Sequence, residues 1–351
     1  MNLTRNIHKG LWNPTDKYMT SKIFFRRESF FVLAVSILFS IIAGLRILGL
    51  DRDYYQYLGG WQELAQGYGT RWEPFFEFLA TTIQSSFGDE SFHFFLLIVA
   101  FIGLSIKLNI FSKNKHFALV SFIYLVMLFP IHEMTQVRVA LGIAFAYLGL
   151  YKATFEKSSF LVRLSYAILA AGSHFSMLVL VPFILIPKIA YLRSSSLILL
   201  LGASSIVLFP ILIQFATEYL LLGTNVGTLL DFYINVEVLD DSTLTPNPFS
   251  LRAIVFVLLL LIGIYNLKVM PSEALPWFYI SFFGVVSYYV LSFFPTGAHR
   301  LFELTMISNL VWATKLPGKS KTISLFLLLL FGIYSFAKLF ILTDTYFVTS
   351  P

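Results

Sequence analysis

The sequence contains no cysteine and few charged residues, and each of these scarcities limits what the protein can be. Without cysteine there is no disulfide framework, no thiol nucleophile and no cysteine-ligated metal. Only 13% of the residues are charged, whereas 57% are hydrophobic, and the mean hydropathy is +0.78. Because ordinary soluble domains do not have this composition, the sequence predicts an integral membrane protein.

Apolar runs follow one another along the chain at lengths that suit membrane-spanning helices. The first extends from Ser29 to about Leu50 and is too long for the core of a signal peptide, so we expect it to be retained. The others fall near 92–111, 117–131, 137–153, 159–173, 175–191, 196–216, 250–268, 275–294, 301–316 and 322–342. The sequence therefore predicts an all-α polytopic membrane protein with about eleven transmembrane helices. We expect a cytoplasmic arm over 1–27 and a single transmembrane domain over 28–351.

Basic residues are distributed unevenly around these spans. Lysines and arginines precede the first span and gather in alternate connections, which predicts a cytoplasmic N-terminus and explains the net charge of +6 without a nucleic acid partner. The predicted outer side keeps Lys338 and six arginines: Arg46, Arg52, Arg71, Arg138, Arg252 and Arg300. Arginine stays charged when partly buried and binds phosphate or carboxylate through a planar fork, so we expect the functional site on the outer face.

Two predicted outer loops, about 51–91 and 217–249, are long enough to build a site. The first combines carboxylates with aromatic rings, a mixture that suits sugars, and its candidate sugar-binding residues are Tyr54, Tyr57, Arg71 and Trp72. An aromatic belt at the membrane interface is the alternative interpretation. Within this loop, residues 73–87 begin with Glu73-Pro74 and predict an amphipathic helix at the outer interface. The second loop carries four acids, Asp231, Glu237, Asp240 and Asp241, a type of cluster that is more often solvated than functional.

The short motif Asp51-Arg52-Asp53 matches an acidic pattern with which some membrane glycosyltransferases hold a divalent cation. Arg52 between the two acids would repel a metal, and no cluster of histidine ligands accompanies them. We therefore expect a site without metal or cofactor.

A helical hairpin in the middle of the chain sets Arg138 and His174 at matching depth. Each lies about eighteen residues from Glu156 in the connecting turn, or ~27 Å along a helix, close to the thickness of a bilayer core. Polar groups at such a depth are costly and usually functional. The alternatives are an arginine that reaches toward lipid headgroups and a histidine that caps a short helix.

Several short motifs, in order along residues 28–316, resemble the EpsG family. They are Asp53-Tyr54 with Tyr57, Glu73-Pro74, Gln136-Val-Arg138-Val-Ala140, Ser173-His174-Phe175-Ser176 and His299-Arg300. This family belongs with the Wzy-type polysaccharide polymerases. The resemblance implies a GT-C-like helical fold that acts at the outer face on undecaprenyl-diphosphate-linked oligosaccharides, which serve as donor and acceptor. A flippase and a chain-length regulator are expected partners. The family often has Gly-Thr-Asp before the first tyrosine, where this chain has Asp51-Arg52-Asp53, so both acids stay candidates for the family role.

The chemistry of such a polymerase needs cations at the leaving diphosphate and a base for the incoming hydroxyl. Arg138, Arg300 and Arg52 are the candidate diphosphate-binding residues. His174, Asp53 and Glu73 are the candidate catalytic bases, and His174 is preferred because its ordinary pKa lies near neutrality.

Two other functions remain open from the sequence. One is a transferase like an O-antigen ligase, and the other is a lipid-linked oligosaccharide flippase. The absence of internal repeats, and of charged pairs within the predicted membrane depth, argues against the flippase.

Overall fold

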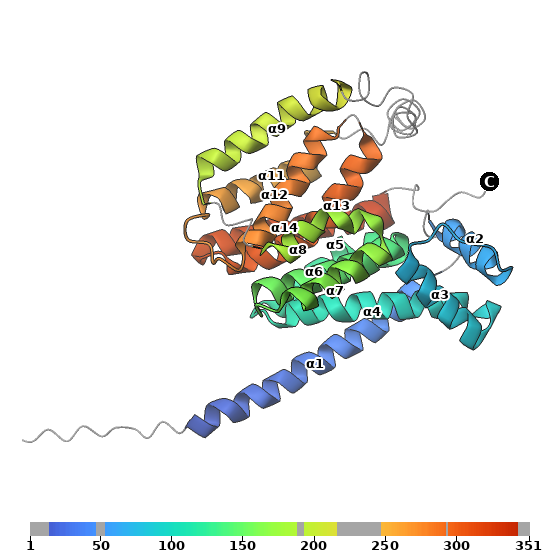
Figure 1. The fold of residues 1–351 in the computed structure, drawn as a ribbon. Helices are drawn as coiled ribbons and strands as arrows, with labels where there is room; N and C mark the ends of the chain where they lie inside the picture. The colour runs from blue at the N-terminus through green and yellow to red at the C-terminus, as the bar shows by residue number, and fades with distance from the viewer. Residues whose placement is uncertain (1–13, 47–52, 188–192, 216–246, 293, 343–351) are drawn as a thin grey trace, which may run out of the picture.

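All regular secondary structure in the part of the chain that can be described is helical. The structure is a computed structural model, and it describes residues 14–46, 53–187, 193–215, 247–292 and 294–342. The long helices run side by side in one bundle, and α2 and α3 lie together at one end of it (Figure 1). We call this the α2–α3 end and the other the opposite end.

The first half of the chain supplies one side of the bundle. Its helices are α1 (Pro14–Gly44), α2 (Tyr54–Ala65), α3 (Pro74–Phe87), η1 (Asp89–Ser91), α4 (Phe92–Ser112), α5 (Phe117–Met127), η2 (Pro130–Thr135), α6 (Val137–Thr154), α7 (Phe160–Ser173), η3 (Phe175–Leu180) and α8 (Val181–Leu185). The second half supplies α9 (Ser195–Phe215), α11 (Leu251–Tyr265), α12 (Leu275–Val290), α13 (Pro295–Trp312), η7 (Ala313–Lys315), α14 (Gly318–Ala337) and η8 (Lys338–Leu342).

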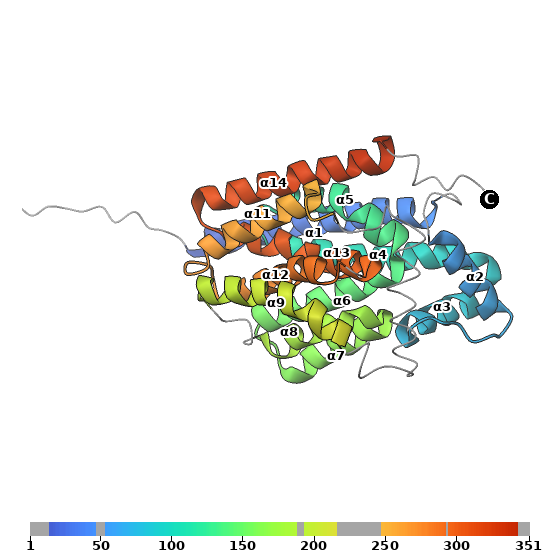
Figure 2. The same ribbon diagram turned by 90° about the horizontal axis from the view of Figure 1, so that it is seen from above.

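The helices pack into two connected groups. Helix α4 lies between α1 and α6, and α6 packs along α7. Helix α14 packs against α5 and α11, while α12 packs against α13 and α9. Seen from above, α14 lies at one edge of the bundle and α7 at the other (Figure 2).

The apolar helices indicate a polytopic membrane protein. Three helices are long and apolar enough to cross a membrane, Asp89–Ser112, Val137–Thr154 and Gly318–Phe340, and seven shorter apolar helices accompany them in the described residues. Each predicted span contains helix within its described residues, but the number of eleven transmembrane helices and the GT-C-like class stay predictions. The predicted second outer loop lies almost entirely outside the described residues.

Helices also occur where the sequence predicts an arm and a loop. Helix α1 begins at Pro14, within the predicted arm over 1–27, and the cytoplasmic location of this arm stays a prediction. The first predicted outer loop contains the helix α2 directly after Asp53, because Tyr54, Tyr57 and Trp61 recur at helical spacing and are all buried. Trp61 stacks on Phe95 of α4 with ring centroids 5.2 Å apart, so this apolar stripe attaches α2 to the bundle.

Helix α3 confirms the amphipathic segment predicted over 73–87. Pro74 occupies its first turn, and Gly88, with φ of 84°, ends it in a conformation that favours glycine. Phe75 contacts the Phe145 ring of α6 at 5.6 Å, and a Cβ added to Gly172 of α7 would lie 3.1 Å from the Phe75 Cβ. Glycine at 172 thus lets α3 pack closely where α6 and α7 meet.

The amino terminus of α6 lies well inside the bundle. A Cβ added to Gly103 of α4 would lie 3.9 Å from the carbonyl oxygen of Ala140, so these two residues share one level. Gly103 comes about eleven residues after the start of α4, and Ala140 about three after the start of α6. At ~1.5 Å per residue, α6 therefore begins roughly 12 Å deeper than α4. The π-helical turn η2 reverses the chain at this depth, and the Gln136 N–H donates to the Ile131 carbonyl at 2.8 Å.

A buried polar cluster holds this reversal in place. Lys107 of α4 pairs with Glu133 of η2, and both side chains are fully inaccessible to solvent. The Tyr124 hydroxyl donates to the Glu133 carboxylate, whose oxygens lie 2.6 and 2.8 Å away. His132 is also fully buried, and neither ring nitrogen finds a hydrogen-bond partner among the described residues. The cluster corrects two expectations: Lys107 is not in a cytoplasmic connection, and a charged pair does lie within the apolar bundle.

We expect the Lys107–Glu133 pair to respond to substitution as a unit. Lys107→Met leaves an unpaired buried carboxylate and should destabilise the fold by about 3–5 kcal/mol, and Glu133→Met should act similarly. The double variant should recover most of that loss, because two apolar side chains replace a pair that is costly to bury. Thermal unfolding in detergent micelles measures this. A double variant no more stable than either single variant would contradict the assignment.

Candidate functional site

Three polar side chains from separate elements converge at the α2–α3 end. Glu73 precedes α3, Arg138 lies in the first turn of α6, and His174 separates α7 from η3. Arg138 Nη1 lies 2.9 Å from Glu73 Oε2, and His174 Nε2 lies 3.7 Å from Glu73 Oε1. The buried carboxylate of Glu73 therefore lies between a guanidinium and an imidazole, and we call these three residues the Glu73 cluster.

The backbone at each position explains this convergence. Glu73 is extended at the N-cap of α3, with φ and ψ of −68° and 150°, because it precedes Pro74. His174 is extended as well, with φ of −161°, and this interrupts the helix between Ser173 and Phe175. Phe75 lies two residues after Glu73, and Gly172, which it contacts, lies two residues before His174. This contact between α3 and α7 brings the two positions together. The hairpin prediction that Arg138 and His174 share one depth is consistent with their common contact to Glu73.

Arg138 has a hydrogen-bond donor without an acceptor among the described residues. Its backbone N–H donates to the Tyr57 hydroxyl at 3.4 Å, and its guanidinium lies 5.8 Å from the centre of the Tyr57 ring. One guanidinium nitrogen, Nη1, binds Glu73, but the buried Nε has no hydrogen-bond partner among the described residues. A buried donor without an acceptor costs about 1–3 kcal/mol, so this nitrogen is an unsatisfied position in the Glu73 cluster.

His174 caps η3 and also faces the carboxylate. Its Nδ1 accepts the Ser176 N–H at 3.2 Å and lies 2.7 Å from the Ser176 hydroxyl, so the capping role considered from the sequence is present. Its Nε2 points to Glu73. Burial lowers the pKa of His174, Glu73 opposes this, and Arg138 and Arg300 add to the lowering. With Nδ1 accepting the Ser176 N–H, the neutral imidazole carries its proton on Nε2.

Arg300 belongs to the same region. It lies in α13, its side chain is exposed, and its positive charge acts on His174. No ion pair of Arg300 occurs within the described ranges. Two arginines and a carboxylate thus surround one histidine, with one arginine paired and the other facing solvent.

A second ion pair adjoins the Glu73 cluster through Gln136. Arg252 Nη1 of α11 lies 3.1 Å from Glu303 Oε1 of α13. The Gln136 side-chain amide donates a hydrogen bond to Glu303 Oε2 at 3.0 Å. His299 Nδ1 lies 3.5 Å from Arg252 Nη1. Since Gln136 is two residues from Arg138, these residues extend the polar region across α6 toward α11 and α13.

The other candidate residues have different surroundings. Tyr54 and Tyr57 are buried, and Trp72 is half-buried, with its ring stacked on Phe95 at 6.2 Å. These rings pack α2 and α3 on α4, so their contact with sugar stays a prediction. Arg71 is exposed and Asp53 is half-buried at the N-cap of α2. Asp51 and Arg52 lie outside the described residues, and so do Asp231, Glu237, Asp240 and Asp241.

Sequence reasoning missed Glu303 and the role of Gln136. Glu303 is an acid inside a predicted apolar span, three residues after Arg300, and that position alone marks it as unusual. Gln136 opens the motif around Arg138, but nothing in the sequence tells which distant carboxylate it contacts. Within the described residues, no three histidine, aspartate or glutamate side chains are grouped as a metal site would need.

Comparison with known proteins yields one match. The model of the EpsG family matches residues 29–349, which is nearly the whole chain. Neither the curated proteins nor the solved structures give a significant match. Because the matched region includes the Glu73 cluster, Gln136 and Glu303, the site and the family assignment concern the same domain. The chain belongs to the EpsG family.

Proposed function

We propose that this protein is a membrane glycosyltransferase that polymerises undecaprenyl-diphosphate-linked oligosaccharide repeat units. The EpsG family is associated with exopolysaccharide biosynthesis, and the chain belongs to it over residues 29–349. The α2–α3 end would face the extracytoplasmic side of a bacterial inner membrane. The sugar hydroxyl of one repeat unit attacks the anomeric carbon of another chain, and the lipid diphosphate leaves.

The unpaired Nε of Arg138 carries this proposal. A diphosphate oxygen would supply the acceptor that this buried nitrogen lacks, while Nη1 remains bound to Glu73. Arg300 adds a second, exposed guanidinium near His174. As the glycosidic bond breaks, negative charge grows on the diphosphate, and cations already in position stabilise it. Arg52 remains a proposed third contact.

The geometry favours Glu73 over His174 as the group that takes the proton from the acceptor hydroxyl. With Nδ1 of His174 accepting the Ser176 N–H, the free ring nitrogen, Nε2, bears a hydrogen and points toward the carboxylate. His174 then orients the Glu73 carboxylate from one side, and Arg138 orients it from the other side. Asp53 remains the third candidate base, on α2 beside Tyr57.

An apolar groove on the α14 side of the bundle suits the prenyl chain of the carrier. It has a volume of about 450 Å³ and lies between α1, η2 and α14, where its lining includes Phe39, Phe129, Met134 and Phe336. Pocket volumes of this size are usual for small-molecule ligands. Because η2 leads directly into α6, a chain in this groove would end near the level at which Arg138 lies.

A flippase or transporter is the second candidate, and one observation favours it. The Lys107–Glu133 pair is a charged pair inside the bundle, of the kind that marks transport pathways in membrane proteins. The two functions differ in a deletion strain. Single repeat units on the lipid carrier at the outer face indicate a missing polymerase, and units retained on the cytoplasmic side indicate a missing flippase.

Purified protein in liposomes with its lipid-linked repeat unit should produce a ladder of polymer lengths, and the ladder should persist in excess chelator. The candidate residues offer arginines in place of a metal, so no divalent ion is needed. Gel separation of the products measures both points. Activity that chelator abolishes and magnesium or manganese restores would make Asp51 and Asp53 metal ligands instead.

Arg138→Lys and Arg300→Lys should each reduce polymerisation roughly ten- to hundredfold, because an ammonium keeps the charge but loses the planar fork that binds phosphate, and at Arg138 this fork also holds Glu73. Arg163→Lys is the matched control, since Arg163 caps the Leu185 carbonyl in another part of the bundle. Rates of chain growth at equal protein levels measure the effect. Wild-type chain lengths from both variants would remove these arginines from the proposed diphosphate site.

Glu73→Gln should lower the rate by at least a factor of about 10² while lipid-linked substrate still binds, as loss of a general base does. His174→Gln, which keeps an N–H for Glu73, should retain far more activity than His174→Ala. Asp53→Asn should stay active. Single-turnover rates and substrate binding on each variant give the comparison. A His174→Gln protein as inactive as His174→Ala, beside an active Glu73→Gln, would identify His174 as the base.

A further inference from the structure

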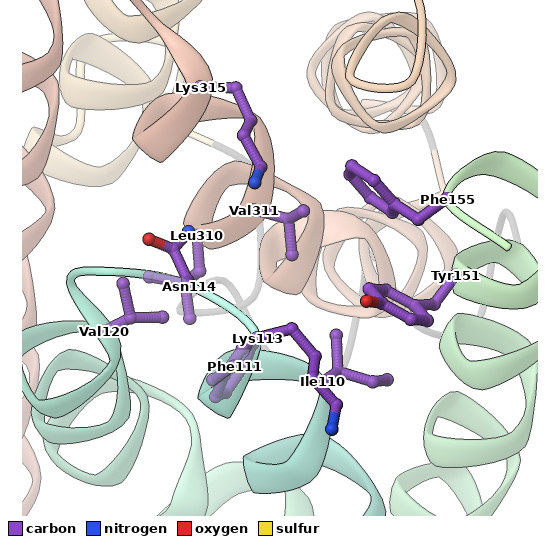
Figure 3. A pocket seen from close by; sticks show the side chains of 10 residues that line it. All are labelled: Ile110, Phe111, Lys113, Asn114, Val120, Tyr151, Phe155, Leu310, Val311 and Lys315. Carbon is purple, nitrogen blue, oxygen red and sulfur yellow. The ribbon is translucent and has the colours of Figure 1, made fainter. Parts of the chain in front are cut away.

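A small cavity opens at the opposite end of the bundle from the Glu73 cluster. Its volume is about 100 Å³, and it lies between the α4–α5 turn, the end of α6 and η7. Figure 3 shows Lys315 extending from η7 into this space, with Tyr151 and Phe155 entering from the facing helix. Lys113 lies at the rim. The remaining wall is mostly apolar, and no acidic residue is among the side chains that line the cavity.

Lys315 is the informative side chain here. It is half-buried, and its Nζ lies 5.2 Å from the centre of the Phe155 ring. It makes no hydrogen bond or ion pair with any residue in the described ranges. Burial lowers the pKa of Lys315, while Glu273 opposes this from a distance too great for an ion pair. The ammonium therefore gives up part of its hydration and gains only an aromatic face in return.

The charge and shape of the cavity select an anion. A partly buried cation that faces an apolar wall is stabilised by a counter-ion, and Lys113 adds a second ammonium at the entrance. Two further exposed lysines lie near the cavity in sequence, Lys115 between α4 and α5 and Lys319 in the first turn of α14. The positive charge of this region attracts anions. The volume admits one compact group, and the apolar wall favours a group that is attached to hydrocarbon.

We propose that this cavity binds the phosphate of an anionic lipid headgroup, with Lys315 as the inner contact and Lys113 as the outer one. Basic pockets between membrane helices bind such headgroups on the cytoplasmic side, where anionic lipids are concentrated. The lysines of this end were expected on that side from the sequence. The site is separate from the Glu73 cluster and does not depend on the proposed glycosyltransferase activity.

The alternative is that these lysines attract the membrane surface without a defined site, as exposed lysines commonly do. The two interpretations predict different effects of substitution. In a defined site, removing the charge of Lys315 weakens lipid binding more than removing the charge of a lysine outside the cavity. Lys319 provides that comparison, because it is exposed, lies four residues further along the chain and does not line the cavity.

Native mass spectrometry of the detergent-purified full-length protein tests the proposal with phosphatidic acid and phosphatidylcholine as probes. We expect phosphatidic acid to be retained in preference to phosphatidylcholine. Lys315→Gln should weaken its retention roughly fivefold, and Lys319→Gln should change it by less than about twofold. Equal losses in the two variants, or no preference between the lipids, would overturn the site.

Two further arms complete the test. Inorganic phosphate at millimolar concentration should not displace the lipid, and full displacement would show that the ligand is soluble phosphate. If Lys315→Gln does not elute as a folded species in size-exclusion chromatography, Lys113→Gln replaces it. That variant removes the outer contact at an exposed position and should also weaken retention of phosphatidic acid, and unchanged retention would then overturn the site.

Discussion

Charged side chains inside an apolar bundle must be paired, and this constraint shapes the region where α6 begins. Lys107 pairs with Glu133 just before that point, Arg138 with Glu73 just after it, and Arg252 with Glu303 beside it. Each pair joins segments that are distant in the sequence, so each is also a tertiary cross-connection. An unpaired charge at such positions would cost several kcal/mol, which favours the reversal at η2 that brings Lys107 and Glu133 together.

The packing around the Glu73 cluster is apolar, and it determines where the polar groups lie. Phe75 fits between Phe145 and Gly172, and this contact carries Glu73 to the junction of α6 and α7. The buried stripe on α2 fixes Tyr57 under the backbone of Arg138. The aromatic residues of the first loop, which look like a sugar platform in the sequence, thus act first as the core that orients a carboxylate and a guanidinium.

The sequence predicts the helical spans and α3 well, because apolar periodicity and a proline at a first turn are local signals. It also predicts that Arg138 and His174 lie at one level, because the number of residues from Glu156 to each is the same. Other features depend on contacts that no local pattern records. Helix α2 exists because its stripe meets α4, Lys107 is internal because Glu133 faces it, and Glu303 joins the site through Gln136. The preference for His174 as base rested on its ordinary pKa, whereas the bond from Ser176 to Nδ1, visible only in three dimensions, directs attention to Glu73.

The shortness of α7 has a mechanical consequence for the surrounding lipid. If α7 spans the membrane as the sequence predicts, its 14 residues extend over ~21 Å against a hydrocarbon core of ~30 Å, and bilayer and helix are mismatched along this edge. Lipids beside α7 adapt by compressing, at a cost of a fraction of a kcal/mol per Å. Compression draws headgroups inward next to the recessed end of α6. Under the proposed function, a lipid-linked repeat unit that approaches along this edge, opposite the groove at α14, would therefore reach the depth of Arg138 without first moving its charged group through undisturbed hydrocarbon. Membrane deformation would thus lower the cost of substrate entry.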